Sequence, residues 1–218
     1  MTDEQALPSG HLPGRRAALT LAGLSILTAL LPYRSPARAA SASPDMPPFV
    51  RRGLPGPFQE ALQPLAGSWN VDKRIYIAVG TRDHPAVSQS MTCKRNWFGG
   101  GKHLQDVTEG RLGNGDYFRM GVLGFSNMDR RYEWATFDAL NANSMFYRSA
   151  VMDTPSKNIV LTGMFTDQGL LGEAQVGKSI PMRTTLEILG PDRHVIDLTF
   201  MPPGEPEILI DHSIYTRA

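Results

Sequence analysis

The chain has 218 residues, a near-neutral formal charge of +1 and one cysteine, Cys93. This length suits one domain preceded by a targeting segment. The charge balance gives no reason to expect binding to nucleic acid or to an anionic membrane. Because a single cysteine cannot form an internal disulfide, the stability of the domain has to come from its hydrophobic core.

The first 39 residues have the features of an export signal. Arg15 and Arg16 precede an uncharged apolar run, Ala17 to Leu31, which is shorter than the roughly twenty residues of a membrane-spanning helix. Ala37-Arg38-Ala39 offers small residues for a cleavage site. The pattern resembles a twin-arginine signal, so we expect an exported protein, periplasmic or secreted, and exclude residues 1–39 from the fold. The alternative is a buried N-terminal helix.

The rest of the chain divides into a linker and a strand-rich domain. Residues 40–57 are rich in proline, serine and glycine, which predicts a flexible linker. Residues 58–65 could form two turns of helix. From Trp69 onward, short alternating or apolar runs are separated by turn residues, with no long helical periodicity between them. We predict strands at 69–79, 89–98, 103–110, 117–125, 131–138, 143–151, 158–166, 181–189, 193–201 and 207–216.

Short links between consecutive strands predict an antiparallel meander, which protects its edges best by closing on itself. We therefore expect residues 58–218 to form an all-β domain: a closed, antiparallel, up-and-down barrel of about ten strands with a short N-terminal helix. Trp69, at the start of the first strand, would plug one end. Closure would lay the last strand beside the first, where Arg217 could stack on Trp69 in a cation–π contact.

Several blocks of the sequence resemble known barrel proteins. A glycine-x-tryptophan start paired with a C-terminal arginine is similar to the calycins, meaning lipocalins and fatty-acid-binding proteins. The blocks of a closer resemblance are Leu65-Ala66-Gly67-Ser68-Trp69, Trp97-Phe98-Gly99-Gly100-Gly101-Lys102-His103-Leu104-Gln105, Gly121-Val122-Leu123-Gly124-Phe125-Ser126-Asn127, Tyr132 with Trp134 and Asp138, Leu161-Thr162-Gly163 with Asp167, and Tyr215-Thr216-Arg217. They are similar to the bacterial domain-of-unknown-function family 1579 (DUF1579), which implies a calycin-like barrel. Phe125, where tyrosine is commoner, and His103, where an aromatic is usual, depart from the family pattern. The resemblance implies no established activity and no catalytic residue.

The leading functional hypothesis is a binding protein that holds a small apolar or amphipathic molecule in a cavity of roughly several hundred cubic ångströms. Trp97 and Arg95 share one face of the predicted second strand, and an inward Arg95 would suit a carboxylate-bearing ligand. Arg95 could instead extend to the rim. Trp134 shares a face with Asp138 and is a further candidate ligand contact. A third hypothesis is a structural role in which side chains fill the interior.

An enzyme that uses the same cavity is the alternative, and His212 is its first candidate. By strict alternation His212 shares a face with Ile208, Ile210 and Ile214. On that face it is either a core residue whose hydrogen bonds are satisfied or a ligand-binding residue directed into the cavity. Its place near the C-terminus resembles that of the axial histidine of the heme-binding nitrobindins. Heme is therefore the one cofactor considered, and otherwise no cofactor is expected.

His103 and Asp138 are the other candidate catalytic residues. His103 alternates with polar and apolar residues and either lines a polar cavity or faces water. Asp138, beside aromatic residues, could act as a general acid or base, or could cap the turn that follows it. No CxxC, HExxH or His-x-His pattern occurs, so no metal site is expected. The oligomeric state, the ligand and the occurrence of catalysis stay open.

Overall fold

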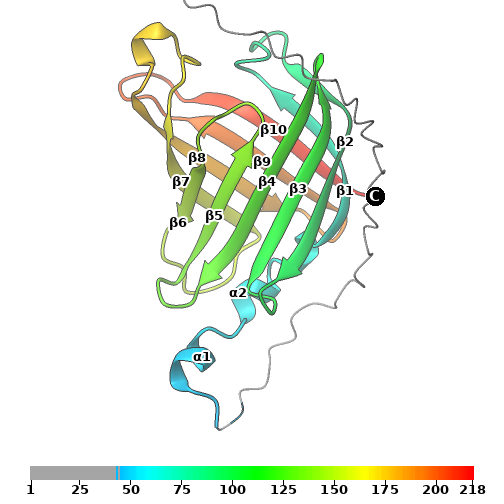
Figure 1. The fold of residues 1–218 in the computed structure, drawn as a ribbon, viewed down its shortest axis with the longest axis vertical. Helices are drawn as coiled ribbons and strands as arrows, with labels where there is room; N and C mark the ends of the chain where they lie inside the picture. The colour runs from blue at the N-terminus through cyan, green and yellow to red at the C-terminus, as the bar shows by residue number, and fades with distance from the viewer. Residues whose placement is uncertain (1–42, 44) are drawn as a thin grey trace, which may run out of the picture. The chain divides into compact units, whose positions relative to one another are not determined.

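Ten antiparallel strands close into one barrel (Figure 1), in the order β1-β10-β9-β8-β7-β6-β5-β4-β3-β2. The computed structural model describes residue 43 and residues 45–218, and the predicted export signal, residues 1–39, lies outside them. The strands are β1 (Gly67–Ile75), β2 (Ala86–Phe98), β3 (His103–Leu112), β4 (Gly115–Ser126), β5 (Arg131–Asp138), β6 (Met145–Ser149), β7 (Asn158–Thr166), β8 (Ser179–Ile188), β9 (Arg193–Phe200) and β10 (Ile208–Arg217). The predicted all-β, closed up-and-down barrel is confirmed.

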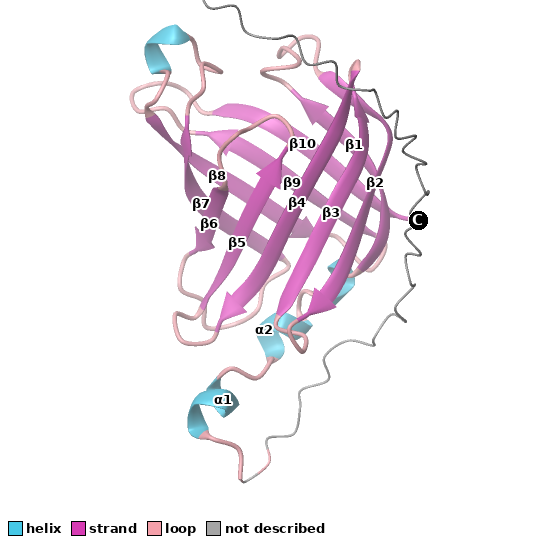
Figure 2. Cartoon of the chain, viewed as in Figure 1, coloured by secondary structure: helices cyan, strands magenta, loops and turns pink. Residues whose placement is uncertain are grey.

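Short helices flank the barrel (Figure 2): α1 (Pro48–Arg52), α2 (Pro57–Glu60) and the 3-10 helices η1 (Gln63–Leu65) and η2 (Glu173–Gln175). The helix predicted at 58–65 is thus present as two pieces. Pro64 has no N–H to donate to the carbonyl of Glu60, so an α-helix cannot continue through this point. No helix among the described residues is long and apolar enough to cross a membrane.

Residues 45–57, the continuously described part of the predicted linker 40–57, are held to the barrel at Arg52 and Leu54. They contain α1, and the Asn127 side chain between β4 and β5 donates hydrogen bonds to the carbonyls of Arg52 at 2.8 Å and Leu54 at 2.9 Å. The chain then passes through α2 and η1 to the start of β1. This route brings buried Leu62 and Leu65 against the same end of the barrel as Trp69.

The first and last strands meet at Trp69 and Arg217, which are register partners between β1 and β10. The Trp69 indole is fully buried and donates to the Leu65 carbonyl at 2.9 Å, while the Arg217 guanidinium carbon lies 3.9 Å from the Trp69 ring centroid. Gly67 has φ +124°, and a Cβ there would overlap the Arg217 guanidinium. A glycine therefore lets the arginine cover the tryptophan.

The two ends of the barrel differ. At the end sealed by Trp69, here called the closed end, lie the links β2–β3, β4–β5, β6–β7 and β8–β9. At the opposite end, here called the open end, lie the links β1–β2, β3–β4, β5–β6, β7–β8 and β9–β10. Inward side chains such as Leu161, Met182 and Leu186 are buried in a single core cluster. Cys93, also inward, is a buried free thiol.

Candidate functional site

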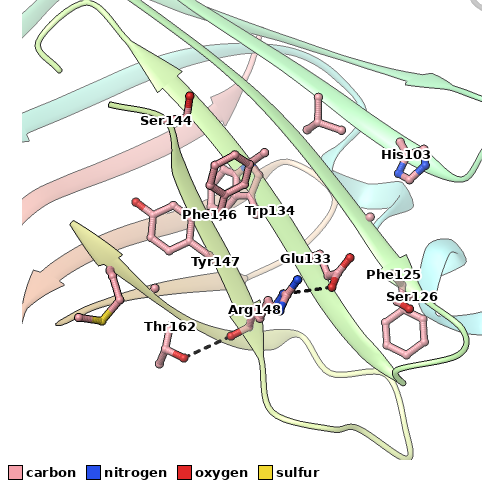
Figure 3. A pocket seen from close by; sticks show the side chains of 15 residues that line it. His103, Phe125, Ser126, Glu133, Trp134, Ser144, Phe146, Tyr147, Arg148 and Thr162 are labelled. Carbon is pink, nitrogen blue, oxygen red and sulfur yellow. Dashed lines mark hydrogen bonds and ion pairs between the residues drawn. The ribbon is translucent and has the colours of Figure 1, made fainter. Parts of the chain in front are cut away.

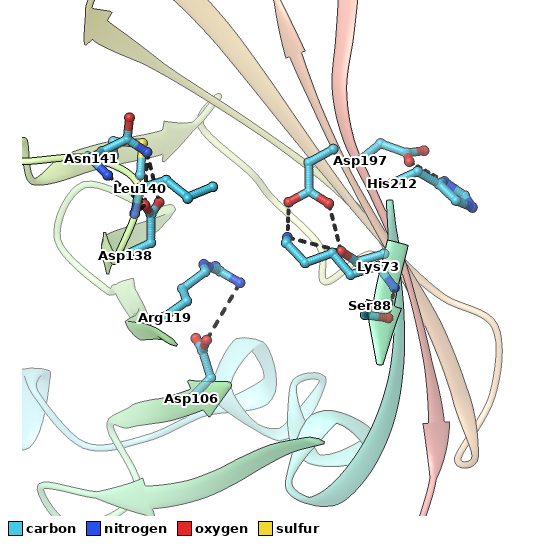
Figure 4. Close-up of polar contacts among 12 residues, drawn as sticks. Lys73, Ser88, Asp106, Arg119, Asp138, Leu140, Asn141, Asp197 and His212 are labelled. Carbon is cyan, nitrogen blue, oxygen red and sulfur yellow. Dashed lines mark hydrogen bonds and ion pairs between the residues drawn. The ribbon is translucent and has the colours of Figure 1, made fainter. Parts of the chain in front are cut away.

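The barrel interior carries charge as well as apolar side chains. Strand alternation turns six charged side chains inward, three cationic and three acidic: Lys73, Arg95, Arg119, Asp106, Asp138 and Asp211. Ion pairs and hydrogen bonds join most of them (Figure 4). Since charge is costly to bury without a partner, their arrangement defines where a ligand could find free polar groups.

Lys73 and Asp211 form an ion pair between β1 and β10. The Lys73 side chain is 2% exposed, and its Nζ also donates to Ser213 Oγ at 3.3 Å. Ser213 in turn donates to Asp211 Oδ1 at 2.7 Å. Burial lowers the pKa of Lys73, and the Asp211 carboxylate counteracts part of this effect. Lys73 and Asp211 therefore neutralise each other, and Ser213 hydrogen-bonds to both.

Arg119, on β4, is a cation with 11% of its side chain exposed, and its hydrogen-bond donors are unused. Its guanidinium lies 4.6 Å from the Trp134 ring centroid and 3.7 Å from Asp106 Oδ1, and it makes no hydrogen bond to any described residue. Burial, the largest single effect, lowers the pKa of Arg119, but the Asp106 carboxylate together with Tyr215, Tyr117 and Tyr147 outweighs burial, so the pKa is raised. Asp106 Oδ2 accepts from the Trp134 indole at 3.3 Å. Gly121 makes room for that contact, because a Cβ there would overlap both partners.

Asp138 faces inward at the end of β5, and its carboxylate also holds the β5–β6 turn. Oδ1 accepts from the backbone N–H of Leu140 at 2.8 Å and of Asn141 at 3.0 Å, and the Asn141 side chain donates to both oxygens. Asp138 thus lies on the face of Trp134 and caps the turn, as the sequence predicts, whereas its role as a general acid or base stays a prediction.

Two neighbouring cavities, which share five lining residues, lie among the described residues in the open half of the interior. The outer cavity, of about 60 Å³, is bounded by residues of the open-end links and the adjoining strands, mostly apolar: Ile75, Ile77, Leu140, Phe165, Leu170, Phe200 and Ile210. The inner cavity, of about 40 Å³, is more polar and is lined among others by Tyr117, Arg119, Thr136, Asp138, Tyr147, Thr184, Asp211, Ser213 and Tyr215. The predicted cavity of several hundred cubic ångströms is wrong, because large inward side chains occupy most of the barrel.

Tyrosine hydroxyls line the inner cavity as proton donors. Burial raises the pKa of Tyr147 and Tyr215 to about 12 and that of Tyr117 well above its usual value. All three are therefore protonated at neutral pH. The Tyr147 hydroxyl donates to the Met145 sulfur at 3.5 Å, which is a weak acceptor, and it also interacts with the hydroxyls of Thr184 and Thr136. Tyr147 is therefore a hydroxyl donor on the wall of the inner cavity.

Arg95 and Trp97, predicted to contact the ligand, lie inward on β2 but toward the closed end. Trp97 donates its indole N–H to Gln63 Oε1 at 2.8 Å. Arg95 is 3% exposed, donates to His194 Nε2 and lies 4.5 Å from the Tyr215 ring centroid. Neither residue lines the two cavities. Of the predicted ligand contacts, Trp134 is the one that lines the inner cavity.

His212 does not face the interior, so the face predicted for it is wrong. Between Leu209 and Asp211 the pairing of β10 with β9 shifts by one residue, a β-bulge that reverses the alternation. Asp211 therefore points inward and His212 outward, where its Nδ1 lies 2.6 Å from Asp197 Oδ1 on the outer face. His212 is consequently not placed to ligate a heme, or to act as an acid or base, inside the barrel.

His103 is exposed on the outer face, beside Phe98 at a ring separation of 5.4 Å. It borders a shallow hollow of about 880 Å³ across the outside of β4 to β7 (Figure 3). Small residues, among them Gly124 and Ala135, form its floor, and Phe146 beside it is 64% exposed. The candidate catalytic residues His103, His212 and Asp138 therefore do not share a site.

Arg119, Lys73 and Asp211 were not among the residues predicted for the site. A sequence signal existed for Arg119, which shares the period-two face of Tyr117, Gly121 and Leu123. Asp211 could not be assigned in this way, because the bulge before it is invisible to alternation. Among the described residues, no group of three or more His, Cys, Asp or Glu side chains could hold a metal ion.

Together these features define a class of protein: a closed ten-stranded antiparallel barrel, sealed by tryptophan and arginine at one end, with a small polar cavity beneath an apolar opening at the other. The chain belongs to the family described as "Protein of unknown function (DUF1579)", whose model matches residues 54–217. This confirms the family resemblance drawn from the sequence blocks. No curated protein matches the chain.

Proposed function

We propose that the barrel binds a small amphipathic molecule through its open end. The observation that carries this proposal is the polarity gradient along the two cavities. Most side chains that line the outer cavity are apolar, whereas the inner cavity presents the guanidinium of Arg119 without a hydrogen-bond partner among the described residues. A few polar groups at the base of an apolar opening are typical of small-molecule sites.

The dimensions of the cavities limit the ligand. A water molecule needs about 10–15 Å³ of such space. The outer cavity, at about 60 Å³, and the inner cavity, at about 40 Å³, therefore suit a short molecule. Five residues line both cavities, among them Tyr117, Asp138 and Asp211, so one molecule can extend through both. Its polar end would lie near Arg119 and its apolar end near Leu140 and the neighbouring links.

We also propose that the chain is exported to the periplasm or outside the cell, because Arg15-Arg16 and the apolar run that follows resemble a twin-arginine signal. The alternative of an enzyme has less support, because the two candidate histidines lie on the outer face of the barrel.

Binding is tested by NMR titration of the mature chain with pentanamide, pentanoate and 1-pentanol. The chain has three tryptophans, and each indole N–H gives its own signal. We expect at least one probe to shift the Trp134 indole signal saturably, because Trp134 lines the inner cavity. The Trp69 and Trp97 signals should stay in place, since both indoles are hydrogen-bonded at the closed end.

A blocked opening supplies the second half of this test. Leu140→Trp places a bulky ring at the outer cavity and should weaken binding at least tenfold. The matched control is Leu189→Trp, since Leu189 is 50% exposed at the closed end. The proposal fails if no probe shifts Trp134, or if Leu140→Trp binds as well as the control.

A further inference from the structure

We infer that the polar end of the ligand is an uncharged carbonyl group, as in an amide, ester or ketone, and not a carboxylate. The inference rests on the proposed function and concerns the same cavities. It follows from a comparison of the charges that line the cavities with the hydrogen-bond donors that they offer.

The linings of both cavities carry more negative than positive charge. Asp138 and Asp211 are the charged residues among those that line the outer cavity. The inner cavity adds one cation, Arg119, to the same two carboxylates. A ligand carboxylate would therefore lie close to Asp138, which forms no ion pair with a described residue, and to Asp211, whose charge Lys73 balances. Like charges in a low-dielectric interior repel strongly.

The cations inside the barrel are already balanced. Lys73 is paired with Asp211, and Arg119 lies 3.7 Å from Asp106. Arg95 stacks on Tyr215 and lines neither cavity. With three cations facing three carboxylates, the interior has no surplus positive charge for an added anion. A charge that is buried without a compensating partner is strongly disfavoured.

Hydrogen-bond donors, by contrast, are in surplus. The guanidinium of Arg119 has five N–H donors and makes no hydrogen bond to the described residues. The Tyr147 hydroxyl, which contacts the Met145 sulfur and the hydroxyls of Thr184 and Thr136, is a second donor on the same cavity wall. A neutral carbonyl oxygen can accept from both without adding charge. The cavity therefore offers what a carbonyl group needs and lacks what a carboxylate needs.

The test compares pentanamide with pentanoate at pH 7, with the Trp134 indole signal as the readout of binding. The two molecules have almost the same shape and differ in charge. We expect the dissociation constant of pentanamide to be at least tenfold lower than that of pentanoate. In Asp138→Asn the ratio of the pentanoate to the pentanamide dissociation constant should decrease about three- to tenfold, because one repelling charge is removed. The amide oxygen of the asparagine can still accept the hydrogen bonds that hold the β5–β6 turn. Asp116→Asn, at an exposed site on β4, is the matched control and should leave the ratio unchanged.

The outcomes separate this inference from the proposed function. If neither molecule shifts Trp134 and 1-pentanol fails as well, the proposed function is wrong. If both bind and pentanoate binds as tightly as pentanamide, the site exists but the inference is wrong. A preference for pentanamide that is the same in Asp138→Asn as in the Asp116→Asn control overturns the electrostatic explanation.

Discussion

Replacing Lys73 by methionine is expected to lower the free energy of unfolding by about 3–5 kcal/mol, one of the largest single-site effects in the chain. Methionine preserves the length of the side chain but leaves the Asp211 carboxylate without its cation in the barrel interior. The loss should be largely recovered in the double variant Lys73→Met/Asp211→Leu, because the interior then contains neither charge. Urea unfolding of the two single variants and the double variant measures this coupling.

The neighbouring residue provides the control. Arg74 pairs with Asp72 at 3.6 Å, but both side chains are 48% exposed, so Arg74→Met should cost less than about 1 kcal/mol. A Lys73→Met variant no less stable than Arg74→Met would show that the interior pair is hydrated. That result would contradict the description of a barrel largely filled by its own side chains.

His194 should make the barrel sensitive to acid. Burial first, and the nearby cations Arg95 and Arg217 second, lower the pKa of His194 to about 2. The imidazole is fully buried between Trp69 and Tyr215, and Arg95 donates to its Nε2. In the unfolded chain a histidine takes up its proton near pH 6.5. Between these values the unfolded state binds one more proton, so stability is lost as the pH falls.

We expect this group to remove about 3 kcal/mol of stability between pH 7.5 and pH 4.5, since a difference of one proton corresponds to about 1.4 kcal/mol per pH unit. His194→Gln retains an acceptor for Arg95 but does not titrate. Between pH 7.5 and pH 4.5 the unfolding free energy of His194→Gln should therefore decrease by about 3 kcal/mol less than that of the wild type. This holds even if the variant is less stable than the wild type at every pH. His84→Gln, in an exposed loop, should keep the wild-type pH dependence. Equal slopes in His194→Gln and wild type would refute a neutral, buried His194.

The barrel could be predicted from the sequence because alternation indicates each strand, and turn residues indicate its ends, without knowledge of the other strands. All ten predicted strands are present, and the pairing of Trp69 with Arg217 follows once the ring closes. Alternation also predicts correctly that Trp134 and Asp138 lie on the same face of β5, the face toward the barrel interior. These features depend on local chemistry, which the amino-acid order records directly.

The site was harder to predict because it depends on features that local patterns do not contain. One extra residue in β10 reverses the faces of Asp211 and His212, and no turn residue marks it. The volume of the interior depends on how large side chains such as Trp134 and Phe165 pack, which is a three-dimensional property. Arg95 and Arg119 both face inward, but alternation does not tell how far along the barrel each lies. Arg95 contacts His194 toward the closed end, whereas Arg119 lines the inner cavity.

A crystal structure grown with 4-bromobutanamide tests the central claim most directly, because the anomalous signal of bromine locates the probe without a prior assumption. The claim is that the open end leads to a polar cavity at Arg119. We predict one bromine site in the outer cavity, near Leu140 and Leu170, with the amide oxygen within hydrogen-bonding distance of the Arg119 guanidinium. Bromine found only in the hollow outside β4 to β7, or only at the closed end, would contradict the claim.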